Sequence, residues 1–190
     1  MIEHAARYLA ALEGILARID HGEIAALGEL LWEAYLADRL ILICGNGGSA
    51  ATAAHMACDL QKGTRPAPGR RFRALALIDN APLVTAWAND EAYEAALARQ
   101  VESLAAPGDL VIGISASGRS PNILRALSAA RERGAKTAGL TGRGGAPLRA
   151  LCDVCCTVPS EDVEKLEDAH AVIMHVVVSG LRARIDAGGV

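Results

Sequence analysis

The chain has 190 residues and a mass of 19.7 kDa, which suffices for one full hydrophobic core but not for two ordinary domains. A net charge of −3 excludes a strongly basic nucleic-acid-binding protein, and no apolar run reaches the roughly 18 residues of a membrane span. The five cysteines are an odd number and the N-terminus lacks the basic start of a signal peptide, so we expect a cytoplasmic protein without a disulfide framework.

The hydrophobic pattern predicts helices that alternate with short strands. Residues 2–38 have helical spacing and break near His21-Gly22 into two helices. Strands are predicted at 40–44, 73–78, 110–115, 136–140 and 152–158, and further helices at 49–60, 91–104, 121–134 and 161–186. Strands that are apolar throughout are buried on both faces, which indicates an α/β fold: a three-layer, doubly wound parallel sheet of five strands. We expect a single domain over 1–190, with N-terminal helices (1–38) used in oligomerisation and a sheet core with terminal helix (39–190).

A glycine-rich loop follows the first predicted strand, and it is a candidate phosphate or substrate site. Its residues Asn46, Gly47, Gly48 and Ser49 lead directly into a helix. Glycines let the backbone approach a ligand closely, and a helix N-terminus offers unpaired N–H groups. The loop has no lysine, so it is not a Walker A loop. A tight strand-to-helix turn without a ligand is the alternative interpretation.

A serine-rich loop follows the third predicted strand and is the more specific signal. Ser115, Ser117 and Ser120 fall within six residues, and Pro121 stands at the expected first helical position. Hydroxyl groups and the free N–H groups of a helix can together surround a phosphate. The alternative is a helix N-cap with additional serines.

These two loops carry a resemblance to a known family. The segments CGNGGSAATAAHMACDL and VIGISASGRSPNILRALSAARERGAKTAGLTG resemble the sugar isomerase (SIS) domain family, and within it the phosphoheptose isomerases. The resemblance implies the SIS fold and conversion of sedoheptulose 7-phosphate to glycero-manno-heptose 7-phosphate through an enediol. It assigns Ser115, Ser117 and Ser120, with help from Ser49, to the sugar phosphate. Ala116 departs from the family, which usually has Thr there and so one more hydroxyl.

An aldose–ketose isomerase needs a base near the enediol and a group that polarises its oxygens. His55 and Asp59 are four residues apart and share one face of the predicted helix. The terminal helix carries Glu167 and His175, and His175 lies in apolar sequence, where an unpaired titratable group is costly to bury. Each residue also has an ordinary interpretation, since histidines in apolar helices are often core residues and acidic residues often face solvent.

The resemblance implies roles for these four side chains. It makes His175 and Asp59 the proton-transfer residues, and it implies zinc or another divalent ion bound by His55, Asp59, Glu167 and His175. Asp59 replaces the family's Glu and is one methylene shorter. We therefore predict that Asp59 is a metal ligand and that His175 is the base. Glu167 replaces the family's Gln and lies eight residues from His175, too far for easy chelation of one ion. We therefore expect either a contribution across a subunit interface or three protein ligands completed by water.

The resemblance implies two further substrate contacts and an assembly. Asp90 matches a polar site position, with a helix N-cap as the alternative, and Arg65 lies in a basic loop where the family often has a positive charge near the substrate. The second N-terminal helix is apolar on more than one face, so we expect a homo-oligomer, and the resemblance implies a tetramer with sites at subunit interfaces.

Two alternatives stay open at this point, an adaptor role and a cysteine zinc site, and a third, a regulator, is disfavoured. Some SIS relatives are binding or adaptor proteins, including one that assists bacterial replication initiation, and these tend to lose the acidic residue of the first site helix. A phosphosugar-sensing regulator would normally be fused to a DNA-binding domain, for which this chain has no room and no basic stripe. The CxxCC segment at 152–156 could hold a structural zinc, although small apolar fillers on a buried strand explain it as well.

Overall fold

The computed structural model describes residues 1–64 and 70–188. These residues contain five strands: β1 (Leu40–Cys44), β2 (Arg73–Ala76), β3 (Leu110–Ser115), β4 (Lys136–Gly142) and β5 (Val154–Val158). The helices are α1 (Ile2–Leu16), α2 (His21–Leu36), α3 (Gly48–Cys58), η1 (Asp59–Gly63), α4 (Ala81–Asp90), α5 (Ala96–Leu104), α6 (Pro121–Glu132), α7 (Ala146–Arg149) and α8 (Val163–Asp186).

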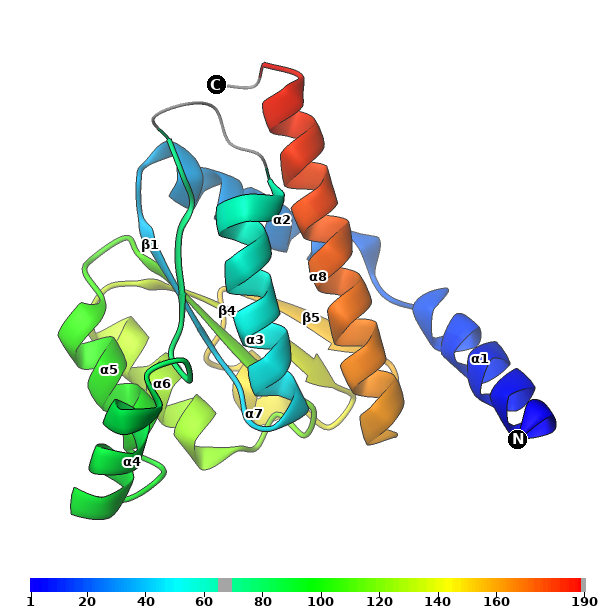
Figure 1. Cartoon of the computed structure of the whole chain (residues 1–190), viewed down its shortest axis with the longest axis horizontal. Coiled ribbons are helices and arrows are strands. Elements are labelled where there is room, and N and C mark those ends of the chain that lie inside the picture. The colour runs from blue at the N-terminus through cyan, green and yellow to red at the C-terminus, as the bar shows by residue number, and fades with distance from the viewer. Residues whose placement is uncertain (65–69, 189–190) are drawn as a thin grey trace.

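The strands form one parallel sheet in the order β2-β1-β3-β4-β5, which confirms the predicted fold class. Helices cover both faces of this sheet (Figure 1). One core cluster lies between the sheet and α2, α3 and α8, and the other lies between the sheet and α4, α5 and α6. The order reverses between β1 and β3, so the loops after these two strands open at a topological switch point, where ligands bind in such sheets.

Four stretches of secondary structure differ from the prediction. Asn80 caps an unpredicted helix, α4, by accepting from the Leu83 backbone N–H at 3.2 Å, and the helix predicted at 91–104 begins only at Ala96. The short helix α7 was also not predicted. The end of α3 widens into η1, a π-helical turn that begins at Asp59. Such turns occur frequently at functional sites, and here the turn places a candidate ligand.

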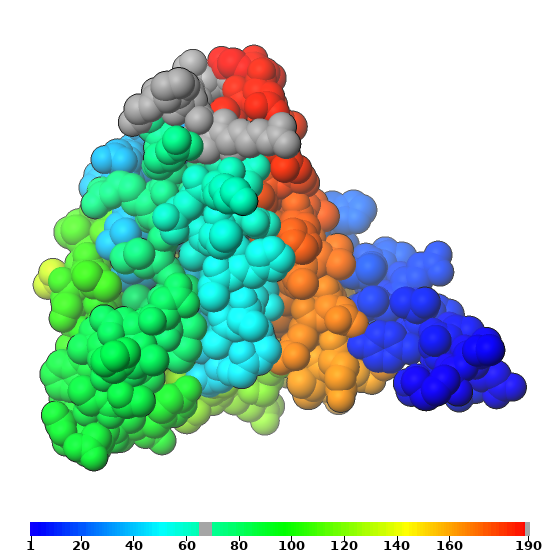
Figure 2. Space-filling view, viewed as in Figure 1, coloured from blue at the N-terminus to red at the C-terminus, as the bar shows by residue number. Residues whose placement is uncertain are grey.

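Helix α1 stands off from the body of the molecule (Figure 2). Ile15 is its one buried residue, and Leu9 is 63% exposed. Its link to α8 is polar: the Tyr8 hydroxyl donates to Asp168 at 2.6 Å, and the Lys165 ammonium lies 4.6 Å from the centre of the Tyr8 ring. None of the helices in the described part of the chain is long and apolar enough to cross a membrane.

Candidate functional site

The glycine-rich loop joins β1 to α3 at the carboxyl edge of the sheet. A side chain at Gly45 would overlap the backbone of Ser49, and Gly47 adopts a positive φ of 53°. The carboxylate of Glu167 lies over Gly48, where any side chain would collide with it. The loop therefore needs its glycines, and Glu167 places an anionic group at the N-terminus of α3, where the helix dipole favours negative charge.

A hydrogen-bond network ties this loop to two other segments. The Asn46 carboxamide donates to Asn122 Oδ1 at 3.0 Å, while Asn122 Nδ2 and the Tyr93 hydroxyl donate to Asn46 Oδ1 at 2.7 and 2.8 Å. Asn122 is buried in the first turn of α6, and Tyr93 lies between α4 and α5. Both residues therefore fix the orientation of a candidate substrate-binding amide.

The serine-rich loop joins β3 to α6 and has a hydrogen-bonded shape of its own. The Ser115 and Ser120 hydroxyls lie 3.0 Å apart, the Gly118 N–H donates to Ser115 Oγ at 3.1 Å, and the Arg119 N–H donates to Ser117 Oγ at 3.2 Å. Ser120 is the N-cap residue of α6 and Pro121 follows at the start, as predicted. The Ser120 side chain makes no capping bond, so the N-terminus of α6 is left without a side-chain acceptor.

The end of β4 and the residues that follow it contact the serine-rich loop. Gly118 has a φ of 63°, and a side chain there would overlap Gly145 and Thr141. The Gly142 N–H donates to the carbonyl of Ala116 at 3.0 Å, and the Ala116 methyl packs against the core. A cavity of about 340 Å³ opens beside Ala116 and Ser117. Ala116 therefore gives this cavity a methyl group at the position where the family usually has the hydroxyl of a threonine.

The second part of the site lies between α3 and α8. His55 Nε2 is 3.5 Å from Asp59 Oδ2, and His175 Nε2 is 3.8 Å from the same oxygen. The two imidazole rings meet edge to face, with centroids 5.0 Å apart. One ligand atom from each of the three residues falls within 4.8 Å of the others, close enough for a single ion to bridge them. Two imidazoles and a carboxylate form a donor set that suits zinc and similar divalent metals.

The structure corrects the expectation that His175 is buried. Its side chain is 54% exposed, whereas His170, one and a half turns earlier on α8, is 1% exposed. Among the described residues, neither ring nitrogen of His170 has a hydrogen-bond partner, and burial lowers the pKa of His170 to about 4. The histidine that the apolar stretch of α8 buries is therefore His170, which the sequence analysis did not select, and not His175.

Glu167 lies apart from the three-residue cluster. Its carboxylate is at Gly48, at the opposite end of α3 from Asp59. Within one chain, three of the four predicted ligands therefore come together, and Glu167 does not join them. Asp90 is exposed at the end of α4 and accepts from its neighbour Asn89 at 2.9 Å. It closes a helix, so the N-cap interpretation of Asp90 is wrong, and Arg65 lies outside the described residues.

Comparison with known proteins places this arrangement in a family. Residues 7–142 match the model of the SIS domain. The phosphoheptose isomerase of Pelobacter propionicus is 42% identical over 167 residues, which is 88% of each chain. The chain belongs to the phosphoheptose isomerase family of SIS domain proteins. A similar enzyme from Geobacter sulfurreducens is 42% identical over 93% of this chain and 91% of its own.

A solved phosphoheptose isomerase has the same fold. The enzyme of Neisseria gonorrhoeae superimposes with a TM-score of 0.88 at 30% identity, covering 95% of this chain and 98% of its own. For this phosphoheptose isomerase family member, sequence reasoning missed Tyr93 and Asn122. Asn122 carried a usable signal, because it directly follows the serine-rich loop at the carboxyl edge, where Asn46 also lies. Tyr93 carried none, since its segment was predicted to be helical.

Proposed function

We propose that this protein is a phosphoheptose isomerase that converts sedoheptulose 7-phosphate to glycero-manno-heptose 7-phosphate through an enediol. The observation that carries the proposal is the pairing of a serine-rich phosphate loop with the His55, Asp59 and His175 cluster. The gathered cluster also disfavours a purely binding or adaptor role.

The phosphate end of the substrate is assigned to the serine-rich loop. Ser115, Ser117 and Ser120 supply hydroxyls, and the N-terminus of α6 supplies free N–H groups and positive dipole character. The N-terminus of α3 is less suitable, because the Glu167 carboxylate already lies there and would repel a phosphate. Asn46, Gly47, Gly48, Ser49, Asp90 and Glu167 are assigned to the sugar hydroxyls.

The cluster fits a divalent metal ion, for which we propose zinc. His55 and Asp59 would hold it from α3 and η1, and His175 is within reach as a third ligand. When bound, the ion would polarise the oxygens of the substrate and stabilise charge that develops on them. An imidazole binds a metal only through an unprotonated nitrogen, so His55 would hold the ion as the neutral side chain.

The proton transfer is assigned to His175. Its Nε2 would take a proton from C1 of the ketose and return it to C2, which gives the aldose. A nitrogen whose lone pair binds a metal is unavailable to a proton, so His175 Nε2 can serve only one of these roles at a time. We assign Asp59 to the metal and His175 to the proton. If His175→Gln lost the metal, that assignment would be reversed.

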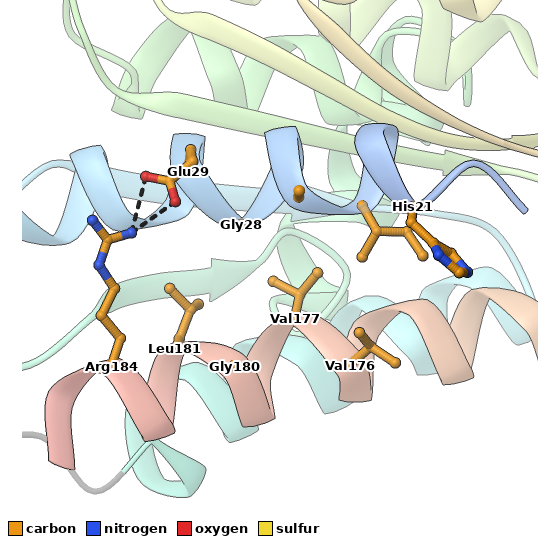
Figure 3. A pocket seen from close by; sticks show the side chains of 10 residues that line it. His21, Gly28, Glu29, Val176, Val177, Gly180, Leu181 and Arg184 are labelled. Carbon is orange, nitrogen blue, oxygen red and sulfur yellow. Dashed lines mark hydrogen bonds and ion pairs between the residues drawn. The ribbon is translucent and has the colours of Figure 1, made fainter. Parts of the chain in front are cut away.

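Self-association to a homotetramer is a further part of the proposal. An apolar groove of about 520 Å³ runs between α2 and α8, past Gly28, Val176 and Gly180 (Figure 3). Arg184 and Glu29 close one end through contacts of 2.8 and 2.9 Å. Val172 and Val176 are 38% and 49% exposed on the same helix as His175. A second copy would cover this face and border the site, and light scattering at micromolar concentration should give a tetrameric mass.

We also propose that residues 1–190 act as one SIS domain and that the enzyme is cytoplasmic, as the odd number of cysteines favours. The deciding experiment is incubation with sedoheptulose 7-phosphate and a panel of other ketose phosphates, with and without a chelator. The expected result is preferential conversion of the seven-carbon substrate, reduced by the chelator. Conversion of a six-carbon ketose phosphate alone would overturn the substrate assignment.

A further inference from the structure

Two cysteines meet at the edge of the sheet, away from the site described above. Cys155 is the second residue of β5, and in the register of the sheet it lies opposite Gly139 of β4. The sulfurs of Cys152 and Cys155 both lie within 3.3 Å of the point that a Gly139 side-chain carbon would occupy. The glycine thus leaves a space that the two sulfurs share on one face of the sheet.

The two thiols lie in unequal surroundings. The neighbouring Cys152 thiol, and after it the Arg149 guanidinium, lower the pKa of Cys155, although burial and the Glu23 carboxylate oppose them. The neighbouring Cys155 thiol and burial raise the pKa of Cys152. Arg149 is held in place, since it donates to the Cys155 carbonyl at 3.3 Å and to Thr157 Oγ1 at 2.7 Å. Of the two, Cys155 is therefore the cysteine whose surroundings favour the thiolate, the nucleophilic form, more strongly.

The other buried cysteines lack these features. Burial raises the pKa of Cys44 and of Cys156 to about 12, as expected for thiols that only fill apolar space. Cys156 faces the opposite side of the sheet and donates to the Glu23 carbonyl at 3.3 Å. Within the described ranges, His55, Asp59 and His175 are the one cluster with three metal-ligand atoms in range, so the pair is short of ligands for a structural zinc.

We propose that Cys152 and Cys155 are a redox modification site that closes to a disulfide when a peroxide reaches it. The Cys155 thiolate attacks one peroxide oxygen, which forms a sulfenic acid and releases hydroxide. The Cys152 sulfur then attacks the Cys155 sulfur and expels its hydroxyl, while the Cys152 proton ends on a leaving oxygen. Two thiols lose two hydrogens in total, and hydrogen peroxide becomes two molecules of water. Cys152 is partly exposed, which gives a water-sized oxidant access to the pair.

The test is oxidation of the native, full-length protein with a limited amount of hydrogen peroxide. Free thiols are then alkylated, and the tryptic peptide 150–165 is analysed by mass spectrometry. We expect this peptide to lose two hydrogens and two alkylation sites, and a dithiol reductant to restore both. Cys156→Ser is the matched control and should still form the disulfide. Cys152→Ser and Cys155→Ser should each abolish it.

Two results would overturn the proposal. One is oxidation of the exposed Cys58 while peptide 150–165 keeps all its thiols. The other is a disulfide that survives in Cys152→Ser, because the bond would then join Cys155 to Cys156. The readout is a mass and not an activity, so it is independent of the isomerase function proposed above.

Discussion

The two faces of α8 place two histidines in opposite surroundings. His170 is buried near Thr141, where neither of its ring nitrogens has a hydrogen-bond partner among the described residues. His175 is partly exposed to solvent, and its Nε2 lies 3.8 Å from Oδ2 of Asp59, which follows α3. Burial without a partner keeps His170 neutral, whereas an exposed imidazole beside a carboxylate is free to move protons or bind a metal. The surroundings of a histidine, more than its place in an apolar stretch, decide its chemistry.

Removal of His175 should give the largest effect on activity. His175→Gln should lower kcat with sedoheptulose 7-phosphate by about 10²- to 10⁴-fold, as expected for lost acid–base catalysis. Steady-state kinetics together with metal analysis measure both proposed roles. Near-normal turnover in this variant would end the mechanism proposed here.

Asp59→Asn should affect the metal more than the proton transfer. We expect the variant to lose bound divalent ion and about 10²-fold in kcat, the scale of several kcal/mol of transition-state stabilisation. Activity should partly return with excess divalent ion. Full metal content with a persistent loss of turnover would instead make Asp59 the base.

The buried His170 of α8 should make the stability of the folded protein depend on pH. The pKa of His170 is about 4 in the folded protein and near 6.5 in the unfolded chain. Between these two pH values His170 is protonated in the unfolded chain but stays neutral in the folded protein. Stability should therefore fall by about 2 kcal/mol between pH 7 and pH 5 because of this group. Urea unfolding of His170→Gln should lack that part of the decrease. An unchanged pH profile would contradict the assignment.

Ser117→Ala should give the smallest effect, because phosphate binding is remote from the reacting carbons. Loss of one hydrogen bond to a charged group should raise KM about tenfold and leave kcat nearly unchanged. Ser128→Ala, on the exposed face of α6, is the matched control and should change neither constant. A loss confined to kcat would remove Ser117 from the phosphate site.

The sheet was the most predictable part of the molecule. The strands at 40–44 and 110–115 were predicted to the residue, because a short apolar run bounded by turns has few other structures available. Helix α4 was missed although Asn80 and Pro82 are regular start signals. The late start of α5 had no such signal, because residues 91–95 have helical composition but form a turn.

The candidate site was predictable in part. The four-residue spacing of His55 and Asp59 placed them on one face, and the resemblance added His175. The position of Glu167 over Gly48 follows from how α8 packs beside α3, which no local pattern encodes. The exposure of His175 likewise depends on tertiary packing.

The most direct test of the account is the conversion of sedoheptulose 7-phosphate in D₂O, followed by proton NMR. Proton transfer by an exposed His175 through an enediol predicts an aldose heptose 7-phosphate that carries deuterium at C2, and the product and its label should appear together. No aldose product, with divalent metal supplied, would contradict the isomerase assignment itself.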